Sequence, residues 1–331
     1  MKNMKKFIIV LAIIILGIFV YYEYNNYISN EKSNEIVSDI KNIKNEIINS
    51  NYKFELKDKS VTVFIEEDEI PEFRFDLKVL KEKRDAKNKN IINFFNGDII
   101  AFKIKINWIK VNKLAILIDD VGENLSTAYK FSNIKEKLNF ATIPFLRDSK
   151  KATSYLRKNG YNVILHMPME SLGSEYLNKR TKDLIRTTMT KKEIINRFEK
   201  GLENIGGAKG FNNHMGSKFT SNKEKMEELL EYVKEKNMYY IDSRTTSKSV
   251  GYKTAKELNI KTYYCSIFLD NEKNVEYIEK RIKLAVEKTK KYGKLVAIGH
   301  YNKITEEALE NMIPYIKENG IKLVFLNEVI E

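Results

Sequence analysis

The sequence predicts an α/β protein whose main domain is a mainly parallel sheet covered by helices, preceded by a transmembrane anchor and a small α+β module. Three changes of pattern along the chain support this prediction. An uncharged apolar run lies near the N-terminus, and short runs of alternating polarity follow it. From Lys113 onward, β-rich apolar runs alternate with charged helical stretches. We therefore divide the chain into residues 1–29, 30–112 and 113–331.

The first segment, residues 1–29, has the pattern of an uncleaved signal-anchor. Lys2, Lys5 and Lys6 precede the uncharged run at residues 7–22, and Tyr24 and Tyr27 after it are suited to a membrane interface that extends the span. No small-residue A-x-A site follows the run, so a cleavable signal peptide is not expected. We expect a single-pass protein of the cell membrane whose later domains are extracytoplasmic.

The second segment, residues 30–112, begins with a predicted helix over residues 30–51. Its apolar residues recur at spacings of three and four and form one apolar stripe: Ile36, Ile40, Ile43 and Ile47. The stripe either docks on the strands that follow, which we favour, or pairs with a second copy to form a homo-oligomer. Residues 52–111 contain short alternating runs typical of half-buried antiparallel strands, and no cluster there suggests chemistry.

The composition narrows the expected partners. Lysine and arginine outnumber aspartate and glutamate by 58 to 45, and the formal net charge is +13. Either a basic exported protein of this kind is attracted to anionic polymers or lipid headgroups of the cell envelope, or its lysines form an ordinary solvated surface. The lysines are scattered among glutamates and form no aromatic-and-basic groove, so nucleic acid is not an expected partner. The single cysteine, Cys265, excludes a framework of internal disulfides.

The third segment, residues 113–331, contains about seven β-rich runs separated by helical stretches. Three of the joints share one chemistry, because a glycine follows a basic helix end at Gly160, Gly293 and Gly320 and can adopt the left-handed cap conformation. Both a β/α barrel and a doubly wound sheet fit this alternation. In either fold the C-terminal ends of the parallel strands meet at one rim, where active sites form.

Titratable residues collect at those strand ends. All three histidines, one arginine and several aspartates follow β-rich runs: Asp119, Asp120, His166, His214, Asp242, Arg244, Asp270 and His300. A single aspartate in such a place is usually a helix cap, but the convergence of the whole set suggests a shared site. Aspartate and histidine together suit a divalent metal such as zinc, and a second carboxylate with a remote histidine supplies a base and an acid. These groups are suited to metal-assisted hydrolysis.

The motifs at these positions are IDDVG, HMPME, FNNHMGSKFT, DSRTT, FLD and AIGH. In this order they resemble the divergent polysaccharide deacetylase family, a branch of the superfamily that includes chitooligosaccharide and peptidoglycan deacetylases. The resemblance covers about residues 113–328 and implies a distorted β/α barrel with fewer than eight strands. It also implies a hydrolase that removes N- or O-linked acetyl groups from an acetylated polysaccharide or peptidoglycan-type substrate of the envelope.

The same resemblance implies roles for the rim residues. The double aspartate matches a motif whose first residue, here Asp119, is the catalytic base and whose second, here Asp120, is a metal ligand. His166 matches the first histidine of an H-x-x-x-H metal motif, in which Glu170 replaces the second histidine. His300 matches the histidine that serves as the acid.

The third metal ligand is either Glu170 or His214, and we favour His214. Pro168 interrupts the segment between His166 and Glu170, so the spacing alone does not place both side chains on one face. Imidazole is a good zinc ligand, and His214 lies in a loop where Gly216 permits a sharp turn. Glu170 would then lie behind a ligand or face the substrate. The expected cofactor is one divalent ion, with zinc as the first choice.

Arginine and amide side chains complete the predicted site. Arg244 is expected to hold Asp119 or Asp242 in place. Asn213 and Asp270 are expected to contact substrate.

The alternative from another functional class is a non-catalytic glycan-binding or envelope-scaffold protein on the same fold. The pairing of a base with an acid argues against it, because a binding module needs neither.

Overall fold

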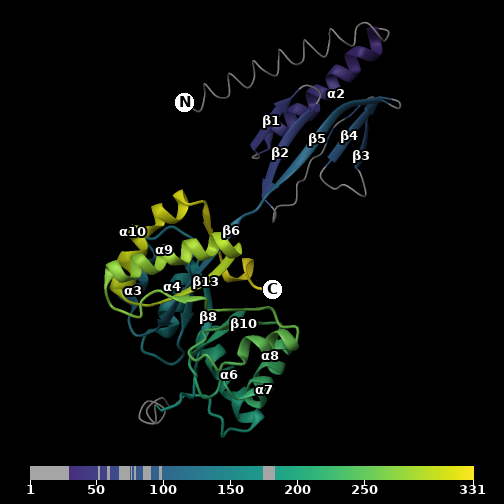
Figure 1. The fold of residues 1–331 in the computed structure, drawn as a ribbon. Helices are drawn as coiled ribbons and strands as arrows, with labels where there is room; N and C mark the ends of the chain where they lie inside the picture. The colour runs from purple at the N-terminus through teal and green to yellow at the C-terminus, as the bar shows by residue number, and fades with distance from the viewer. Residues whose placement is uncertain are drawn as a thin grey trace. The chain divides into compact units, whose positions relative to one another are not determined.

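The computed structural model describes residues 30–50, 53–57, 60–66, 75, 77, 80–84, 91–96, 99–173 and 183–331. The chain forms two compact units, Met1–Val111 and Asn112–Glu331 (Figure 1). The predicted anchor at residues 1–29 lies outside the described residues. Within the described part of the chain, no helix combines the length and the hydropathy needed to cross a membrane.

In the described part of the first unit, a helix packs on a five-stranded sheet with the order β1-β2-β5-β4-β3. The elements are α2 (Asn30–Asn49), β1 (Lys53–Lys57), β2 (Ser60–Glu66), β3 (Lys81–Arg84), β4 (Ile91–Asn96) and β5 (Ile99–Ile109). β2 and β5 are parallel, while the other neighbours are antiparallel. The sheet is therefore mixed and not wholly antiparallel as predicted, because β3 and β4 intervene in the chain before β5 returns beside β2.

The isoleucine stripe of α2 packs against this sheet. Ile36 and Ile43 are buried in one apolar cluster with Val61, Val63 and Phe94. The stripe therefore docks on its own module, which is the alternative that we favoured from the sequence. The sheet of the same chain therefore covers this apolar stripe.

In the described part of the second unit, a nine-stranded sheet has only parallel pairs of neighbouring strands, and it exceeds the seven or so strands expected from the sequence. Its strands are β6 (Asn112–Val121), β7 (Asn139–Thr142), β8 (Asn162–Met169), β9 (Gly210–Met215), β10 (Tyr239–Asp242), β11 (Thr262–Tyr264), β12 (Ile267–Phe268), β13 (Lys294–His300) and β14 (Ile321–Leu323). The helices between them are α3 (Leu125–Phe131), α4 (Ser149–Lys158), α6 (Lys191–Asn204), α7 (Lys223–Glu235), α8 (Gly251–Glu257), α9 (Val275–Tyr292) and α10 (Lys303–Glu318). The predicted glycine caps hold, since Gly160, Gly293 and Gly320 all have positive φ.

The sheet follows the order β11-β10-β9-β8-β7-β6-β13-β12, with β14 added beside β6. Its two end strands, β11 and β12, are consecutive in the chain. The residues between them bond to both sides: Cys265 N–H donates to the Asp242 carbonyl at 2.8 Å and Ser266 N–H to the Val296 carbonyl at 2.9 Å. One continuous segment thus bridges β10 and β13 and closes the sheet into a distorted barrel. Of the two folds left open by the sequence, the barrel is the one adopted.

The two faces of each strand have separate surroundings. Leu114, Ile116 and Ile118 of β6 pack with helix residues such as Ile282 of α9, so their face is the outside of the barrel. The alternate residues, such as Leu117, belong to the interior cluster. The 3-10 helix η1 (Leu326–Glu328) follows β14 and adds Leu326 to that interior cluster. Every second side chain at the C-terminal end of a strand therefore points into the barrel mouth.

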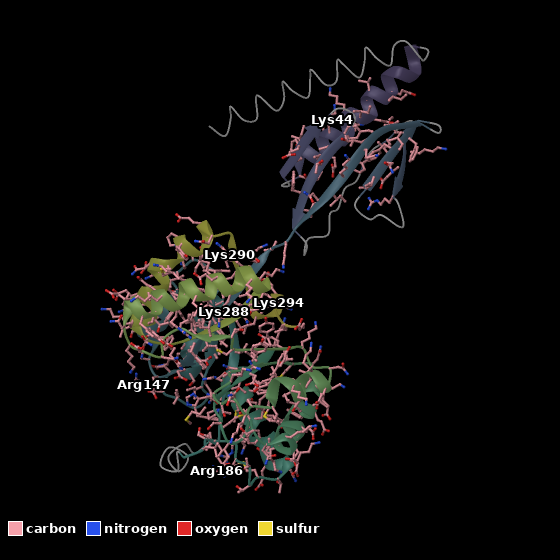
Figure 2. All side chains as sticks on the ribbon, in the orientation of Figure 1. Lys44, Arg147, Arg186, Lys288, Lys290 and Lys294 are labelled. Carbon is pink, nitrogen blue, oxygen red and sulfur yellow. The ribbon has the colours of Figure 1, made fainter. Side chains whose placement is uncertain are left out.

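The basic residues belong to many different elements. Figure 2 labels Lys44 on α2, Arg147 in the loop before α4 and Lys290 near the end of α9. Lys44 is buried within the first unit, and its burial lowers the pKa of its ammonium group. Lys290 instead donates to the side chain of Asn319 on the surface. The positive charges thus lie on different elements, some buried and some at the surface.

Candidate metal centre

A pocket of about 380 Å³ opens at the C-terminal ends of the barrel strands. Six of the residues predicted from the sequence line it: Asp119, Asp120, His166, Asn213, His214 and His300. The alternation of side chains along a strand explains why three of these residues point into the pocket. Asp119, His166 and His300 each follow an interior residue by two positions, after Leu117, Ile164 and Ile298.

Asp119 and Asp120 are adjacent in the chain, yet both line the pocket. Consecutive residues of a regular strand point to opposite faces. Here the pairing of β6 with β7 shifts register between Ile118 and Val121, and Asp120 has φ of 66°. Aspartate tolerates this left-handed conformation better than most residues, at a cost of about 1–3 kcal/mol. The bulge therefore turns both carboxylates into one site.

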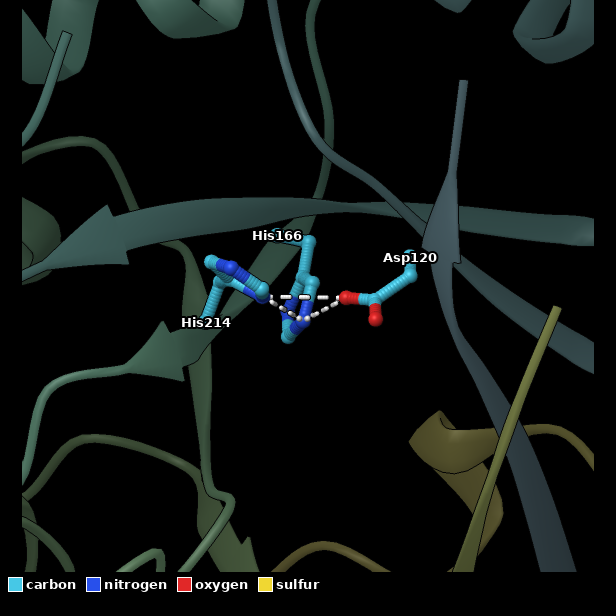
Figure 3. A group of neighbouring side chains, drawn as sticks. All are labelled: Asp120, His166 and His214. Atoms are coloured by element: carbon cyan, nitrogen blue, oxygen red, sulfur yellow. Dashed lines mark hydrogen bonds and ion pairs between the residues drawn. The ribbon is translucent and has the colours of Figure 1, made fainter. Parts of the chain in front are cut away.

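Three side chains from three strands converge beside Asp119. Oδ1 of Asp120 lies 3.2 Å from Nε2 of His166 and 2.9 Å from Nδ1 of His214, and the two nitrogens are 3.3 Å apart (Figure 3). One ligand atom from each residue lies within 4.8 Å of the others. Asp120 comes from β6, His166 from β8 and His214 from β9. The group could hold a metal ion, and it is the set that we favoured from the sequence.

The charges of this group fit a cation. Oδ1 of Asp120 is buried and has no hydrogen-bond partner of good geometry among the described residues, although both imidazoles lie within ion-pair distance. Burial alone raises the pKa of Asp120, but His166 and His214 outweigh it and hold that pKa well below its ordinary value. Burial lowers the pKa of His166, but Asp119 and Asp120 raise it overall. Two nitrogens and one carboxylate oxygen with an open side are a common zinc ligand set.

Glu170 lies outside this group. Its Oε2 accepts from the backbone N–H and the hydroxyl of Thr187 at 2.9 and 2.7 Å, and its Oε1 accepts from Nζ of Lys218 at 2.9 Å. Burial raises its pKa, but Thr187 and Lys218 outweigh this and lower the pKa overall. Glu170 therefore fixes the loops after β8 and β9, because its carboxylate already has three donors.

Asp119 is held by Asn212, a residue that the sequence analysis did not single out. Nδ2 of Asn212 lies 2.9 and 3.1 Å from the two oxygens of Asp119. Burial raises the pKa of Asp119, while the charge of His166 lowers it. The signal that could have identified Asn212 is strand parity. Asn212 precedes His214 by two residues on β9 and must share its face, whereas Asn213 faces the other way.

The amide of Asn213 serves the loops around the pocket. Its Oδ1 accepts from the hydroxyl of Tyr240 and from Ser243 N–H, both at 3.0 Å, and its Nδ2 donates to the Met215 carbonyl at 2.8 Å. Asn213 was predicted to contact substrate, but both polar atoms of its side chain already form hydrogen bonds within the protein. Its place in the site is to fix the ends of β9 and β10.

His300, which lines the pocket, forms a pair with Asp270. Nδ1 of His300 lies 2.8 Å from Oδ1 of Asp270, and Oδ2 of Asp270 accepts from the hydroxyl of Thr305 at 2.6 Å. Burial lowers the pKa of His300, but Asp270 outweighs it and raises this pKa to about 9. Asp270, predicted to contact substrate, instead orients and charges the imidazole, because its carboxylate is turned toward His300.

Asp242 and Arg244 do not join the pocket. Asp242 follows the outward-facing Tyr240 by two positions, and its carboxylate accepts from Arg244 N–H, Ser249 Oγ and Tyr252 N–H at 2.8 to 2.9 Å. The exposed guanidinium of Arg244 lies 4.0 Å from the ring centroid of Tyr264. Arg244 thus holds Asp242, one of its two expected partners, through its backbone N–H and not through its guanidinium.

This chain is similar to one protein family and to several individual proteins. The family model described as divergent polysaccharide deacetylase matches residues 116–330. Uncharacterized protein YibQ of Escherichia coli is 28% identical over 222 residues, 66% of this chain and 69% of that protein. An uncharacterized protein of Haemophilus influenzae is 29% identical over 223 residues, 66% of this chain and 79% of that protein. The crystal structure of an uncharacterized protein from Agrobacterium tumefaciens shares the fold, with a TM-score of 0.63 at 16% identity over 67% of this chain and 90% of that one.

Proposed function

The chain belongs to the divergent polysaccharide deacetylase family, and on that premise we propose that it is a metal-dependent hydrolase that removes N- or O-linked acetyl groups from an envelope glycan. One observation carries the proposal. A group suited to a divalent metal, Asp120 with His166 and His214, shares its pocket with a carboxylate, Asp119, and a charged imidazole, His300.

The metal group would hold a zinc ion through Asp120, His166 and His214. When bound, zinc acts as a Lewis acid that polarises a carbonyl and makes water more acidic. The chain supplies the proton transfers. Asp119 is buried beside this group with its carboxylate oriented by Asn212, and burial raises its pKa and so makes it a better proton acceptor. Asp119 is therefore the base that accepts a proton from the attacking water.

His300 is the acid in this proposal. Its pKa of about 9 keeps the ring protonated at neutral pH. Asp270 engages Nδ1, so Nε2 is the nitrogen left to donate a proton to the departing amine or hydroxyl of the sugar. Asp119 and His300 are register partners on the neighbouring strands β6 and β13, which supports a base and an acid that act on one acetyl group. Both line the same pocket, so one acetyl group can meet both.

We further propose that the protein acts at the outer side of the cell membrane. The uncharged run at residues 7–22 follows three lysines and lacks a cleavage motif, which supports a single-pass anchor. An envelope polysaccharide or peptidoglycan-type polymer would then be within reach of the barrel. The net charge of +13 favours an anionic envelope over a neutral one.

Acetate release from acetylated glycans tests the proposal. The purified full chain, loaded with zinc, should release acetate from N-acetylated or O-acetylated envelope polymers. Asp119→Asn and His300→Gln should each lower the rate by about 10²–10⁴-fold while keeping the zinc content, because each removes one proton transfer. Zinc and glycan binding with no acetate from any such polymer would favour the non-catalytic glycan-binding alternative.

A further inference from the structure

The side chain of Asn212 connects the proposed base to the metal group. It is fully buried, and its Oδ1 lies 2.7 Å from Nδ1 of His166. Its Nδ2 reaches both oxygens of Asp119 and also Oγ of Ser243, at 3.0 Å. One amide therefore contacts the base, a metal-binding histidine and a buried serine at the same time.

These contacts fix which way the amide points. An ionised carboxylate only accepts hydrogen bonds, so the NH₂ group of Asn212 must face Asp119. The carbonyl oxygen of the amide then faces His166 and can only accept. Nδ1 of His166 must therefore carry a hydrogen. In the neutral ring the lone pair is consequently on Nε2.

Nε2 of His166 is the nitrogen that faces the metal group. It lies 3.2 Å from Oδ1 of Asp120 and 3.3 Å from Nδ1 of His214. A hydrogen on Nε2 of the neutral ring would occupy the position that a metal needs. The bond from Nδ1 to the asparagine oxygen removes that alternative, in the way that a partner behind a metal-bound histidine fixes its tautomer.

We propose that Asn212 is a positioning residue that selects the metal-binding tautomer of His166 and holds Asp119 in place for proton transfer. The second half of this inference rests on the proposed function, because it assigns Asp119 as the base. The first half depends only on the metal group. The sheet itself aligns the partners, since His166 and Asn212 are register neighbours on β8 and β9.

The neighbouring asparagine supports this arrangement from the other face of β9. Asn213 accepts from Ser243 N–H, while Ser243 Oγ contacts Asn212. Ser243 is itself buried. The two consecutive asparagines thus hold one serine, and this serine gives the amide of Asn212 a partner besides Asp119 and His166.

Two substitutions in the full chain separate the two roles. Asn212→Ala removes both contacts and should weaken zinc affinity by about 10–100-fold. Asn212→Asp keeps an acceptor for His166 but, when ionised, no donor for Asp119. This variant should retain zinc affinity at or above that of the wild type, while its rate of acetate release falls by about 10–100-fold. Titration with zinc and an acetate assay measure the two quantities separately.

The tautomer of His166 gives a readout that a merely structural role would not change. In metal-free protein, at a pH where the ring is neutral, ¹⁵N NMR should find the hydrogen on Nδ1 in the wild type. It should be distributed over both nitrogens in Asn212→Ala. Asn139→Ala is the matched control. Asn139 is also fully buried and bonds Leu326 N–H at the other end of the barrel, so its loss should lower stability without changing the tautomer or the zinc affinity.

A hydrogen on Nε2 in the wild type overturns the proposal, and so does an Asn212→Ala variant with unchanged tautomer and zinc affinity. If Asn212→Ala does not fold, the wild-type spectrum and Asn212→Asp still decide it. A wild type that binds zinc with the expected tautomer but releases no acetate refutes the proposed function and the role assigned to Asp119. The role of Asn212 toward His166 would stand in that case.

Discussion

The imidazole of His300 is paired with the carboxylate of Asp270, and the same carboxylate also accepts from the backbone N–H of His300 at 2.6 Å. The two residues come from different segments of the chain, since Asp270 follows β12 and His300 ends β13. The side chain of Asp270 is 2% exposed, whereas that of His300 is 41% exposed. The aspartate is thus a buried support, and the histidine keeps access to the pocket.

This pairing predicts the titration of His300. In metal-free wild type, NMR titration should give a pKa of about 9 for the His300 ring. Asp270→Asn removes the negative partner, so the pKa should fall toward or below the ordinary value of 6.5, since burial then dominates. A ring that titrates near pH 9 in Asp270→Asn would show that another group, not Asp270, raises the pKa.

The same shift predicts a pH dependence of stability. The pKa of His300 is about 9 in the folded chain and close to 6.5 when unfolded. The contribution of the charged pair is therefore full below pH 6.5, declines above it and is lost as the pH rises through about 9. Urea unfolding of metal-free wild type at pH 6 and pH 9.5 should show this loss, and Asp270→Asn should show less of it. Equal pH dependence in both proteins would contradict the assignment.

The metal site predicts which substitutions remove zinc. Asp120→Asn is the preferred change at that position, because asparagine also tolerates the φ of 66°. It should weaken zinc affinity by more than the 10–100-fold expected of a residue behind a ligand, as should His166→Ala and His214→Ala. Glu170→Gln is the matched control, and its loss of zinc affinity should not exceed 10–100-fold. Calorimetric titration of purified protein measures all four.

A large loss of zinc in Glu170→Gln, with His214→Ala unaffected, would reverse the choice of third ligand. That outcome would require Glu170 to leave Thr187 and Lys218, which both contact its carboxylate. Loss of folding is excluded separately by far-UV circular dichroism of each variant.

Asp242 is predicted to matter for stability and not for the chemistry. Its carboxylate accepts from two backbone N–H groups and from Ser249, so Asp242→Ala should cost about 1–3 kcal/mol of unfolding free energy. Zinc affinity should stay at the wild-type value. Arg244→Ala removes the exposed contact with Tyr264 and should cost about 1 kcal/mol. Denaturant unfolding measures the stability cost of each variant, and titration with zinc measures the affinity. A loss of zinc affinity in either variant would restore that residue to the site.

The N-terminal segment predicts membrane attachment. The intact chain should fractionate with membranes and keep its first residues, because the run at 7–22 lacks a cleavage motif. The second compact unit, Asn112–Glu331, should remain in the supernatant when expressed alone. N-terminal sequencing of the mature protein checks the first expectation, and a start after Tyr22 would show that the run is a cleaved signal.

The sequence by itself determined the order of the elements and the position of the site along the chain. Alternation of β-rich and helical runs after Lys113 is a local property of the residues, so the parallel sheet could be predicted from it. The ends of LAILIDD, YNVILH and KLVAIGH identified the rim residues Asp119, His166 and His300 for the same reason. The first unit was predicted less completely, because the parallel pairing of β2 with β5 depends on a contact between distant segments.

Only the tertiary structure decided how those residues combine. A bulge in β6 turns Asp120 to the side of Asp119, and the pairing of β8 with β9 brings Asn212 and His214 to His166. Which of two adjacent residues faces the interior depends on register, and a shift of one residue reverses it. That is why Asn212 acts in the site while Asn213 supports the loops. Hydrogen-bond partners far apart in the chain become fixed only when the barrel closes.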